Sequence, residues 1–271
     1  GIVVSGVGLS PVYIAPLTNM LYKTYGLEQI FLFLGIFALV VICLLSLLLR
    51  NPSPSEAAVQ ASSKSAAQTT TQTASKPAES NQKGDYTWQE MVRMPSFYLL
   101  WFAYLMSAAA GLMLIGHMAS IADVQANWKA GFLLVVILAV FNFFGRIIGG
   151  LLSDKVGRTR ALLLVFLIQA ANMFAFSFYT EIPTLIAGSA LAGLAYGALF
   201  ALFPAATADL FGLKNLGVNY GLVFTGWGVA GIIGPIVGGL VADATGSYNI
   251  SYITSAVMLV IGALLVLRMK K

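Results

Sequence analysis

The sequence predicts an all-α polytopic membrane protein, and three observations support this fold class. Hydrophobic residues make up 59% of the 271-residue chain, whereas charged residues make up only 9%. Soluble domains carry about 25% charged residues, so this composition is typical of a protein whose solvent is lipid. Eight apolar runs are long enough to cross a bilayer, and the basic residues between them fall mostly on one predicted side of the membrane.

The eight predicted spans follow one another along the chain. A spanning helix needs about 20 mostly apolar residues, and each run approaches or exceeds this length. Soluble helical cores also contain apolar helices, but eight consecutive runs of this length argue against that alternative. The predicted spans are residues 1–21, 28–49, 96–121, 130–153, 160–179, 182–208, 217–242 and 250–268.

The Lys and Arg distribution predicts the orientation, because cytoplasmic loops are enriched in these residues. Twelve lie on one predicted side and two on the other, so we expect a multi-pass inner (plasma) membrane protein with a cytoplasmic C-terminus and 51–93 loop. This topology also accounts for the net charge of +5 better than nucleic-acid binding does. The twelve are Arg50, Lys64, Lys76, Lys83, Arg93, Lys155, Arg158, Arg160, Lys214, Arg268, Lys270 and Lys271, and the two are Lys23 and Lys129.

Residues 51–93 are rich in Ser, Thr, Ala, Gln and Lys and contain few large apolar residues. This composition predicts a flexible linker, either a plain tether or a segment with a regulatory site. Its last part, residues 86–93, is amphipathic and is expected to lie at the membrane surface. The single cysteine, Cys43, excludes a disulfide framework.

An internal repeat predicts two related halves. Residues 1–10 match residues 221–230 in character: three glycines coincide, and Ser5 aligns with Thr225. Chance similarity between glycine-rich helices is the alternative. If the match is a repeat, the first span corresponds to the seventh, and four further spans precede Gly1 in a twelve-span protein. The expected domains are then 1–50 (the last two helices of an N-terminal six-helix bundle), 51–93 (the linker) and 94–271 (the C-terminal six-helix bundle).

Residues 150–160 contain a glycine, three residues, Asp, a basic residue, any residue, Gly and Arg. This pattern resembles the loop signature of the major facilitator superfamily, which implies that fold, with eight of its twelve helices in this chain. In that family the signature lies on the cytoplasmic side, between the second and third helices of a half, where it also falls here. We expect it to form a cytoplasmic gate, although a simple basic turn is the alternative. The gate residues are Gly150, Asp154, Lys155, Gly157 and Arg158.

Arg146 is the only ionisable residue between Ala130 and Leu152. A charge inside the membrane costs about 2.5–3.5 kcal/mol on insertion scales, so such a residue is interpreted first as functional. Asn142 precedes it by four residues and therefore shares its helical face. Because a guanidinium holds a carboxylate with two parallel hydrogen bonds, the pair predicts an anion site. A structural arginine, neutralised by helix ends or by a carboxylate, is the alternative.

The run from Phe141 to Arg158, with Asn219-Tyr220-Gly221, resembles the oxalate/formate antiporter family and the related monocarboxylate transporters. The resemblance implies that Arg146 binds a substrate carboxylate. The oxalate exchanger of that family has a lysine where this chain has Trp227. A single intramembrane cation favours a monocarboxylate such as lactate, pyruvate or formate, and oxalate/formate exchange is the alternative.

Carriers of monocarboxylates usually move a proton, which requires an acid–base group. His117 has a suitable intrinsic pKa, and Asp123 lies near a point where bacterial lactate carriers also have an acid. A lone interfacial histidine and a solvated loop acid are the respective alternatives.

Four aromatic residues are candidates for the wall of the anion site: Tyr196, Phe200, Phe224 and Trp227. Aromatic residues at helical spacing are also common packing residues, so this alternative stays open.

The sequence contains no phosphate loop and no paired metal-ligand spacing, so we expect no enzyme activity and no cofactor or metal. The expected partners are the bilayer, a small organic anion and a proton, with a functional monomer at full length and no nucleic acid. A channel or a membrane enzyme is the alternative class.

Overall fold

The computed structural model describes residues 10–47 and 85–269, and the elements in these ranges are all α-helices. The all-α prediction is therefore confirmed for the described part. The helices are α2 (Ser10–Tyr25), α3 (Leu27–Ser46), α5 (Trp88–Met91), α6 (Pro95–Ala126), α7 (Phe132–Val156), α8 (Arg158–Phe176), α9 (Ile182–Phe211), α10 (Leu216–Thr245) and α11 (Asn249–Arg268).

Seven of the described helices are long and apolar enough to span a membrane: α3 and α6 to α11. They match the second to the eighth predicted spans, with ends that differ by several residues. The first predicted span, 1–21, lies partly outside the described residues, as does nearly all of the 1–10 repeat. Most of the predicted linker also lies outside them, so its flexibility stays a prediction.

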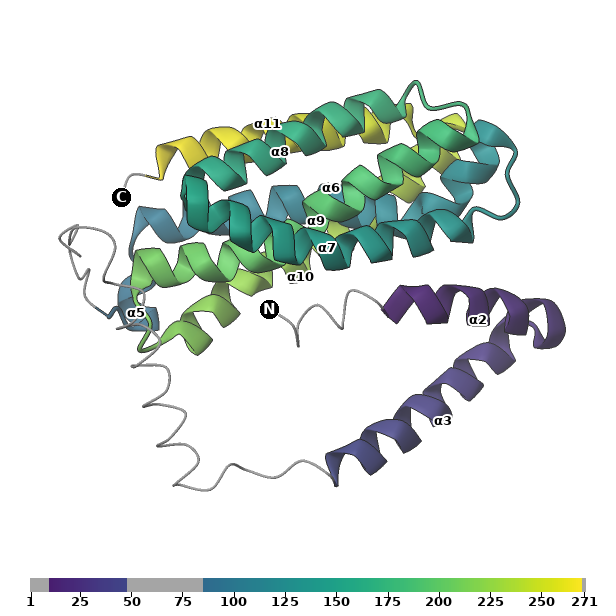
Figure 1. The fold of residues 1–271 in the computed structure, drawn as a ribbon, viewed down its shortest axis with the longest axis horizontal. Coiled ribbons are helices and arrows are strands. Elements are labelled where there is room, and N and C mark those ends of the chain that lie inside the picture. The colour runs from purple at the N-terminus through teal and green to yellow at the C-terminus, as the bar shows by residue number, and fades with distance from the viewer. Residues whose placement is uncertain (1–9, 48–84, 270–271) are drawn as a thin grey trace. The chain divides into compact units, whose positions relative to one another are not determined.

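The chain divides into two units, residues 1–19 with 83–271 and residues 20–82. In the first unit, α6 to α11 lie side by side along the long axis of a bundle (Figure 1). The most extensive contacts join α7 with α9 and α10 with α6, and α11 packs against both α8 and α6. The chain turns from α7 to α8 at Gly157. We call this end of the bundle the Gly157 end, and α11 also ends there.

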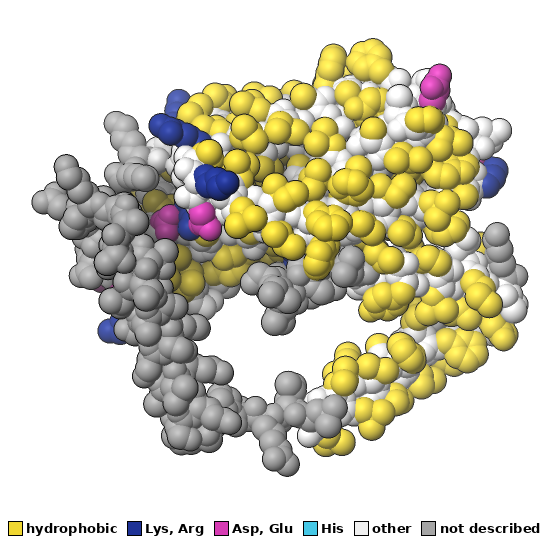
Figure 2. All heavy atoms as spheres, in the orientation of Figure 1, with side chains coloured by type: hydrophobic (Ala, Val, Ile, Leu, Met, Phe, Trp, Pro, Cys, Tyr) yellow, Lys and Arg dark blue, Asp and Glu magenta, His cyan; other side chains and the backbone are white. Residues whose placement is uncertain are grey.

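Large apolar side chains cover the face of this bundle that Figure 2 shows, whereas the charged side chains on that face lie toward the two ends. Phe144, Ile148 and Leu151 of α7 are all exposed, as are Phe174 of α8 and Leu264 of α11. A soluble protein rarely exposes apolar patches of this extent. In lipid, by contrast, helices satisfy their own backbone groups and present apolar side chains outward.

Two glycines of α9 bring its backbone against that of α7. A Cβ at Gly193 would collide with the carbonyl oxygen of Leu138, and a Cβ at Gly197 would collide with that of Asn142. Glycine at both positions therefore permits a backbone approach that any other residue would prevent.

Two glycines of α7 make the reciprocal contact with α9. A Cβ at Gly145 would collide with the carbonyl oxygen of Leu194, and a Cβ at Gly149 would lie 2.6 Å from the Cβ of Ala198. Each helix thus carries a pair of glycines four residues apart, a spacing that places both on one helical face. Small residues at such spacing are the usual means of close helix packing in membranes.

Adjacent glycines of α7 test this packing. Gly149→Ala should lower the free energy of unfolding by about 1–3 kcal/mol, because the added methyl group overpacks the contact with Ala198. Gly150→Ala is the matched control, since its Cβ would lie an ordinary 3.9 Å from the Cβ of Ala201. It should be neutral or slightly stabilising through helix propensity. SDS titration of the purified protein measures both, and equal effects would contradict the packing.

Candidate functional site

Arg146 and Asn142 project from the same face of α7 into the bundle, where they are 8% and 5% exposed. The Nε–H group of Arg146 donates a hydrogen bond to Oδ1 of Asn142 at 3.0 Å. The guanidinium carbon also lies 4.4 Å from the ring centroid of Phe200 on α9, which is a cation–π contact. Asn142 and Phe200 therefore both help to position the guanidinium.

The four predicted aromatic residues form one cluster beside this arginine. Phe200 has its ring centroid 5.4 Å from that of Tyr196 and 6.2 Å from that of Trp227, both edge to face. Phe224 stacks on Trp227 with a centroid distance of 5.0 Å. The structure therefore brings together all six residues that the sequence predicts for the anion site, from α7, α9 and α10.

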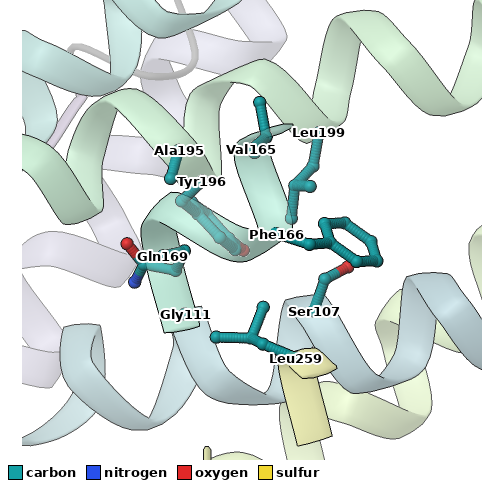
Figure 3. Close-up of a pocket in the computed structure, with 9 residues that line it drawn as sticks. All are labelled: Ser107, Gly111, Val165, Phe166, Gln169, Ala195, Tyr196, Leu199 and Leu259. Atoms are coloured by element: carbon teal, nitrogen blue, oxygen red, sulfur yellow. The ribbon is translucent and has the colours of Figure 1, made fainter. Parts of the chain in front are cut away.

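A hydrogen bond within the cluster joins α9 to α10. The indole N–H of Trp227 donates to the hydroxyl oxygen of Tyr196 at 2.7 Å. Gly111 of α6 makes room for the tyrosine, because a Cβ there would collide with the ring. The ring lines a cavity of about 10 Å³. Figure 3 shows it there with Ser107 and Gln169, which also line this cavity. That volume is about what one buried water molecule requires.

Two further tyrosines near Arg146 were missed by the sequence analysis. The hydroxyl groups of Tyr104 on α6 and Tyr220 on α10 lie 3.4 Å apart. The ring of Tyr104 stacks on Phe203, and both tyrosines pack against Phe224. With Tyr196, they place three phenols within electrostatic reach of the guanidinium. Tyr220 belongs to the Asn-Tyr-Gly motif, which was the available signal, whereas nothing in the sequence distinguishes Tyr104.

His117 lies elsewhere on α6, about 20 Å from Tyr104 at 1.5 Å per residue. Its Nε2 atom is 2.9 Å from the carbonyl oxygen of Pro235, so this nitrogen carries a proton and donates. Its Nδ1 atom is 3.4 Å from the hydroxyl oxygen of Tyr248. His117 therefore links α6 to α10 and to the start of α11, and it does not belong to the Arg146 cluster.

Asp123 also lies apart from Arg146, in the last turn of α6. Its carboxylate pairs with the Lys129 ammonium at 2.8 Å, and the two side chains are 43% and 79% exposed. An exposed pair of this kind contributes about 0–1 kcal/mol. The structure thus places the two candidate proton carriers toward the end of the bundle opposite to Gly157, and it does not bring them together with the residues predicted for the anion site.

The gate motif forms a compact polar turn at the Gly157 end. Gly157 has a φ of +88°, a conformation that favours glycine, and it separates α7 from α8. The Nη1 atom of Arg158 donates to Oγ of Ser153 at 2.7 Å and to Oδ1 of Asp154 at 2.6 Å. Lys155 lies exposed in the last turn of α7. The arginine at the start of α8 therefore holds the end of α7.

Asp209 extends this turn to a third helix, and the sequence analysis missed it. The Nε–H group of Arg158 donates to Oδ2 of Asp209, near the end of α9, at 3.3 Å. The two residues are 51 positions apart, so only the tertiary fold reveals the contact. Arg158 thus ties together the ends of α7, α8 and α9.

Fold and site together define a multi-pass helical membrane protein with a buried cationic site. Within residues 10–47 and 85–269, no group of three His, Cys, Asp or Glu residues is placed to hold a metal ion. The Major Facilitator Superfamily model matches residues 1–182 and 130–271. The chain belongs to this superfamily, whose members are transporters.

Three curated relatives extend the comparison. The chain is 28% identical over 217 residues to the uncharacterized MFS-type transporter YhjX of Escherichia coli, covering 79% of this chain and 50% of the relative. It is 27% identical over 262 residues to the oxalate:formate antiporter of Oxalobacter formigenes, covering 95% and 58%. It is 27% identical over 282 residues to monocarboxylate transporter 12-B of Danio rerio, covering 98% and 59%. The chain thus spans between half and three-fifths of their length.

The hydrogen bond between Trp227 and Tyr196 leads to a prediction about stability. Trp227→Phe removes the donor and Tyr196→Phe removes the acceptor, and each should lower the free energy of unfolding by about 1–3 kcal/mol. The double variant should lose less than the sum of the two, by about 0.5–1.5 kcal/mol, because the second change removes a bond already broken. SDS titration of the four proteins measures the coupling, and strictly additive losses would contradict the hydrogen bond.

Proposed function

We propose that the whole protein containing this chain is a secondary active transporter of small carboxylates, most simply of a monocarboxylate such as lactate, pyruvate or formate. The observation that carries the proposal is the buried Arg146 guanidinium, fixed by Asn142 at 3.0 Å and lying 4.4 Å from the Phe200 ring centroid. Arg146 would bind the carboxylate, and Asn142 would hold the arginine in place.

Physical chemistry supports this assignment of Arg146. A guanidinium presents its N–H groups as a planar fork, which matches the two oxygens of a carboxylate. The Phe200 ring lies against the guanidinium and belongs to one aromatic cluster with Tyr196, Phe224 and Trp227, so apolar surface would lie beside the fork. In such a setting the attraction between ions is stronger than in bulk water. The phenols near the arginine add polar groups that suit a small anion.

The choice of a monocarboxylate depends on Trp227. The indole is neutral and its N–H group is used by Tyr196, so it supplies no second positive charge for a second carboxylate. Two of the relatives are named as an oxalate:formate antiporter and a monocarboxylate transporter. Exchange of oxalate for formate is therefore the alternative within the same class.

We propose transport by alternating access, with two six-helix bundles that rock about a midplane site in a monomeric protein of the plasma membrane. Residues 1–50 would belong to the first bundle and 94–271 to the second. The Gly157 end and the linker would face the cytoplasm, where the ion pairs of Arg158 with Asp154 and Asp209 would close the gate. Proton coupling, if carried by His117 or Asp123, would act at the opposite end.

Arg146→Lys tests the central claim. Lysine keeps the charge but loses the planar fork and the hydrogen bond from Nε to Asn142. In the full-length protein, uptake of labelled lactate or formate into proteoliposomes should fall at least about tenfold, which corresponds to 1.4 kcal/mol, while the protein still folds. Arg160→Lys, at an exposed arginine, is the matched control and should transport normally. Unchanged transport of lactate, formate and oxalate by Arg146→Lys would refute the proposal.

A competition assay tests the preference for one carboxylate. Oxalate should compete poorly against labelled lactate, because the neutral Trp227 supplies no second cation to the site. Trp227→Lys should increase that competition by supplying a second. Strong oxalate competition in the unmodified protein would favour the antiporter alternative. Counterflow in the same proteoliposomes distinguishes a carrier from a channel or an enzyme, since only a carrier exchanges labelled for unlabelled substrate.

A further inference from the structure

Tyr86, which precedes α5, is bound through its backbone to the turn between α9 and α10. Its N–H group donates to the carbonyl oxygen of Phe211 at 3.1 Å. Its own carbonyl oxygen accepts from Nδ2 of Asn215 and from Nδ2 of Asn219, each at 3.0 Å. Both backbone polar groups of this residue are therefore satisfied by the α9–α10 turn, more than 120 residues further along the chain.

Asp85 supplies an acceptor to the turn that leads into α10. Among the described residues, the Asn215 side chain makes no capping hydrogen bond to α10. Oδ1 of Asp85 accepts from the backbone N–H group of Lys214, which lies before α10 begins, at 3.1 Å. A carboxylate near a helix N-terminus also interacts favourably with the helix dipole. Gly212 makes room for it, because a Cβ there would collide with the Asp85 side chain.

The residues that follow Tyr86 hold this segment in a defined conformation. The backbone N–H and the hydroxyl of Thr87 donate to Oε2 of Glu90 at 2.7 and 2.8 Å. These two hydrogen bonds lower the pKa of Glu90 below its ordinary value. Met91 is fully buried against the bundle. The chain is thus anchored on both sides of Thr87, within the part of the predicted linker that the structure describes.

We propose that Asp85 and Tyr86 are positioning residues that hold the Gly157 end of α10, and with it the side chains that α10 contributes to the anion site. Asn219, which binds Tyr86, is followed by Tyr220, whose hydroxyl lies 3.4 Å from that of Tyr104. The Asn-Tyr-Gly motif therefore has two tasks: its asparagine holds the linker and its tyrosine reaches the neighbourhood of Arg146. The expected effect on transport rests on the proposed function. The expected effect on the stability of the start of α10 does not.

Asp85→Ala in the full-length protein is the main test. It removes the acceptor for the Lys214 amide, so hydrogen exchange of the amides in residues 214–222 should become at least about tenfold faster. The KM for labelled lactate should rise several-fold, with a smaller change in maximal rate, because α10 shapes the site without carrying the arginine. Asp85→Asn retains Oδ1 as an acceptor and should restore both values. Gln89→Ala, at an exposed residue of α5, is the matched control.

The readouts separate this inference from the proposed function. Unchanged exchange in residues 214–222 of Asp85→Ala would overturn the positioning role, whatever the substrate is. Faster hydrogen exchange in residues 214–222 with an unchanged KM for lactate would also overturn the positioning role, since α10 would then be loosened without any effect on the site. Unchanged exchange in α8 and α11 verifies that the variant is folded. If the full-length protein transports no carboxylate, the proposed function is refuted. The hydrogen-exchange result would then still test whether Asp85 holds the start of α10.

Discussion

The contact between the backbones of α7 and α9 is the constraint on which the site depends. Gly193 and Gly197 of α9 lie against the carbonyl oxygens of Leu138 and Asn142, so no side chain separates the two helices there. Because the backbones touch, the side chains that flank the contact are brought to the same place. Arg146 on α7 can therefore meet Phe200 on α9 at 4.4 Å without a loop to carry either residue. Rigid helices, rather than flexible connections, set the geometry of the cation.

A buried arginine is stable only where its surroundings compensate for lost hydration. Here Asn142 accepts one hydrogen bond, the Phe200 ring lies close to the cation, and three phenols lie within electrostatic reach. These groups are polar or polarisable but neutral. Such groups compensate for part of the lost hydration of the guanidinium.

The sequence predicted features that depend on local patterns, and it missed those that depend on how helices pack. Apolar length predicted the spans α3 and α6 to α11, and helical spacing placed Asn142 and Arg146 on one face. By contrast, Tyr104 is one aromatic residue among many in α6, and its role appears only when α6 lies against α10. Asp209 likewise meets Arg158 only through the tertiary fold. Whether Arg146 binds substrate remains a prediction, because no pattern or contact in the chain identifies the ligand.

The last turn of α9 connects two features that the sequence places far apart. Asp209 pairs with Arg158 of the gate motif, and two residues later the carbonyl oxygen of Phe211 accepts the hydrogen bond from Tyr86. The gate motif and the linker thus bind neighbouring positions of one helix end. Since α9 also carries Tyr196 and Phe200, and α7 carries both Arg146 and Asp154, each of these helices joins the Gly157 end directly to the buried cation. A displacement at that end would therefore reach the site through two closely packed helices, as the alternating access proposed above requires.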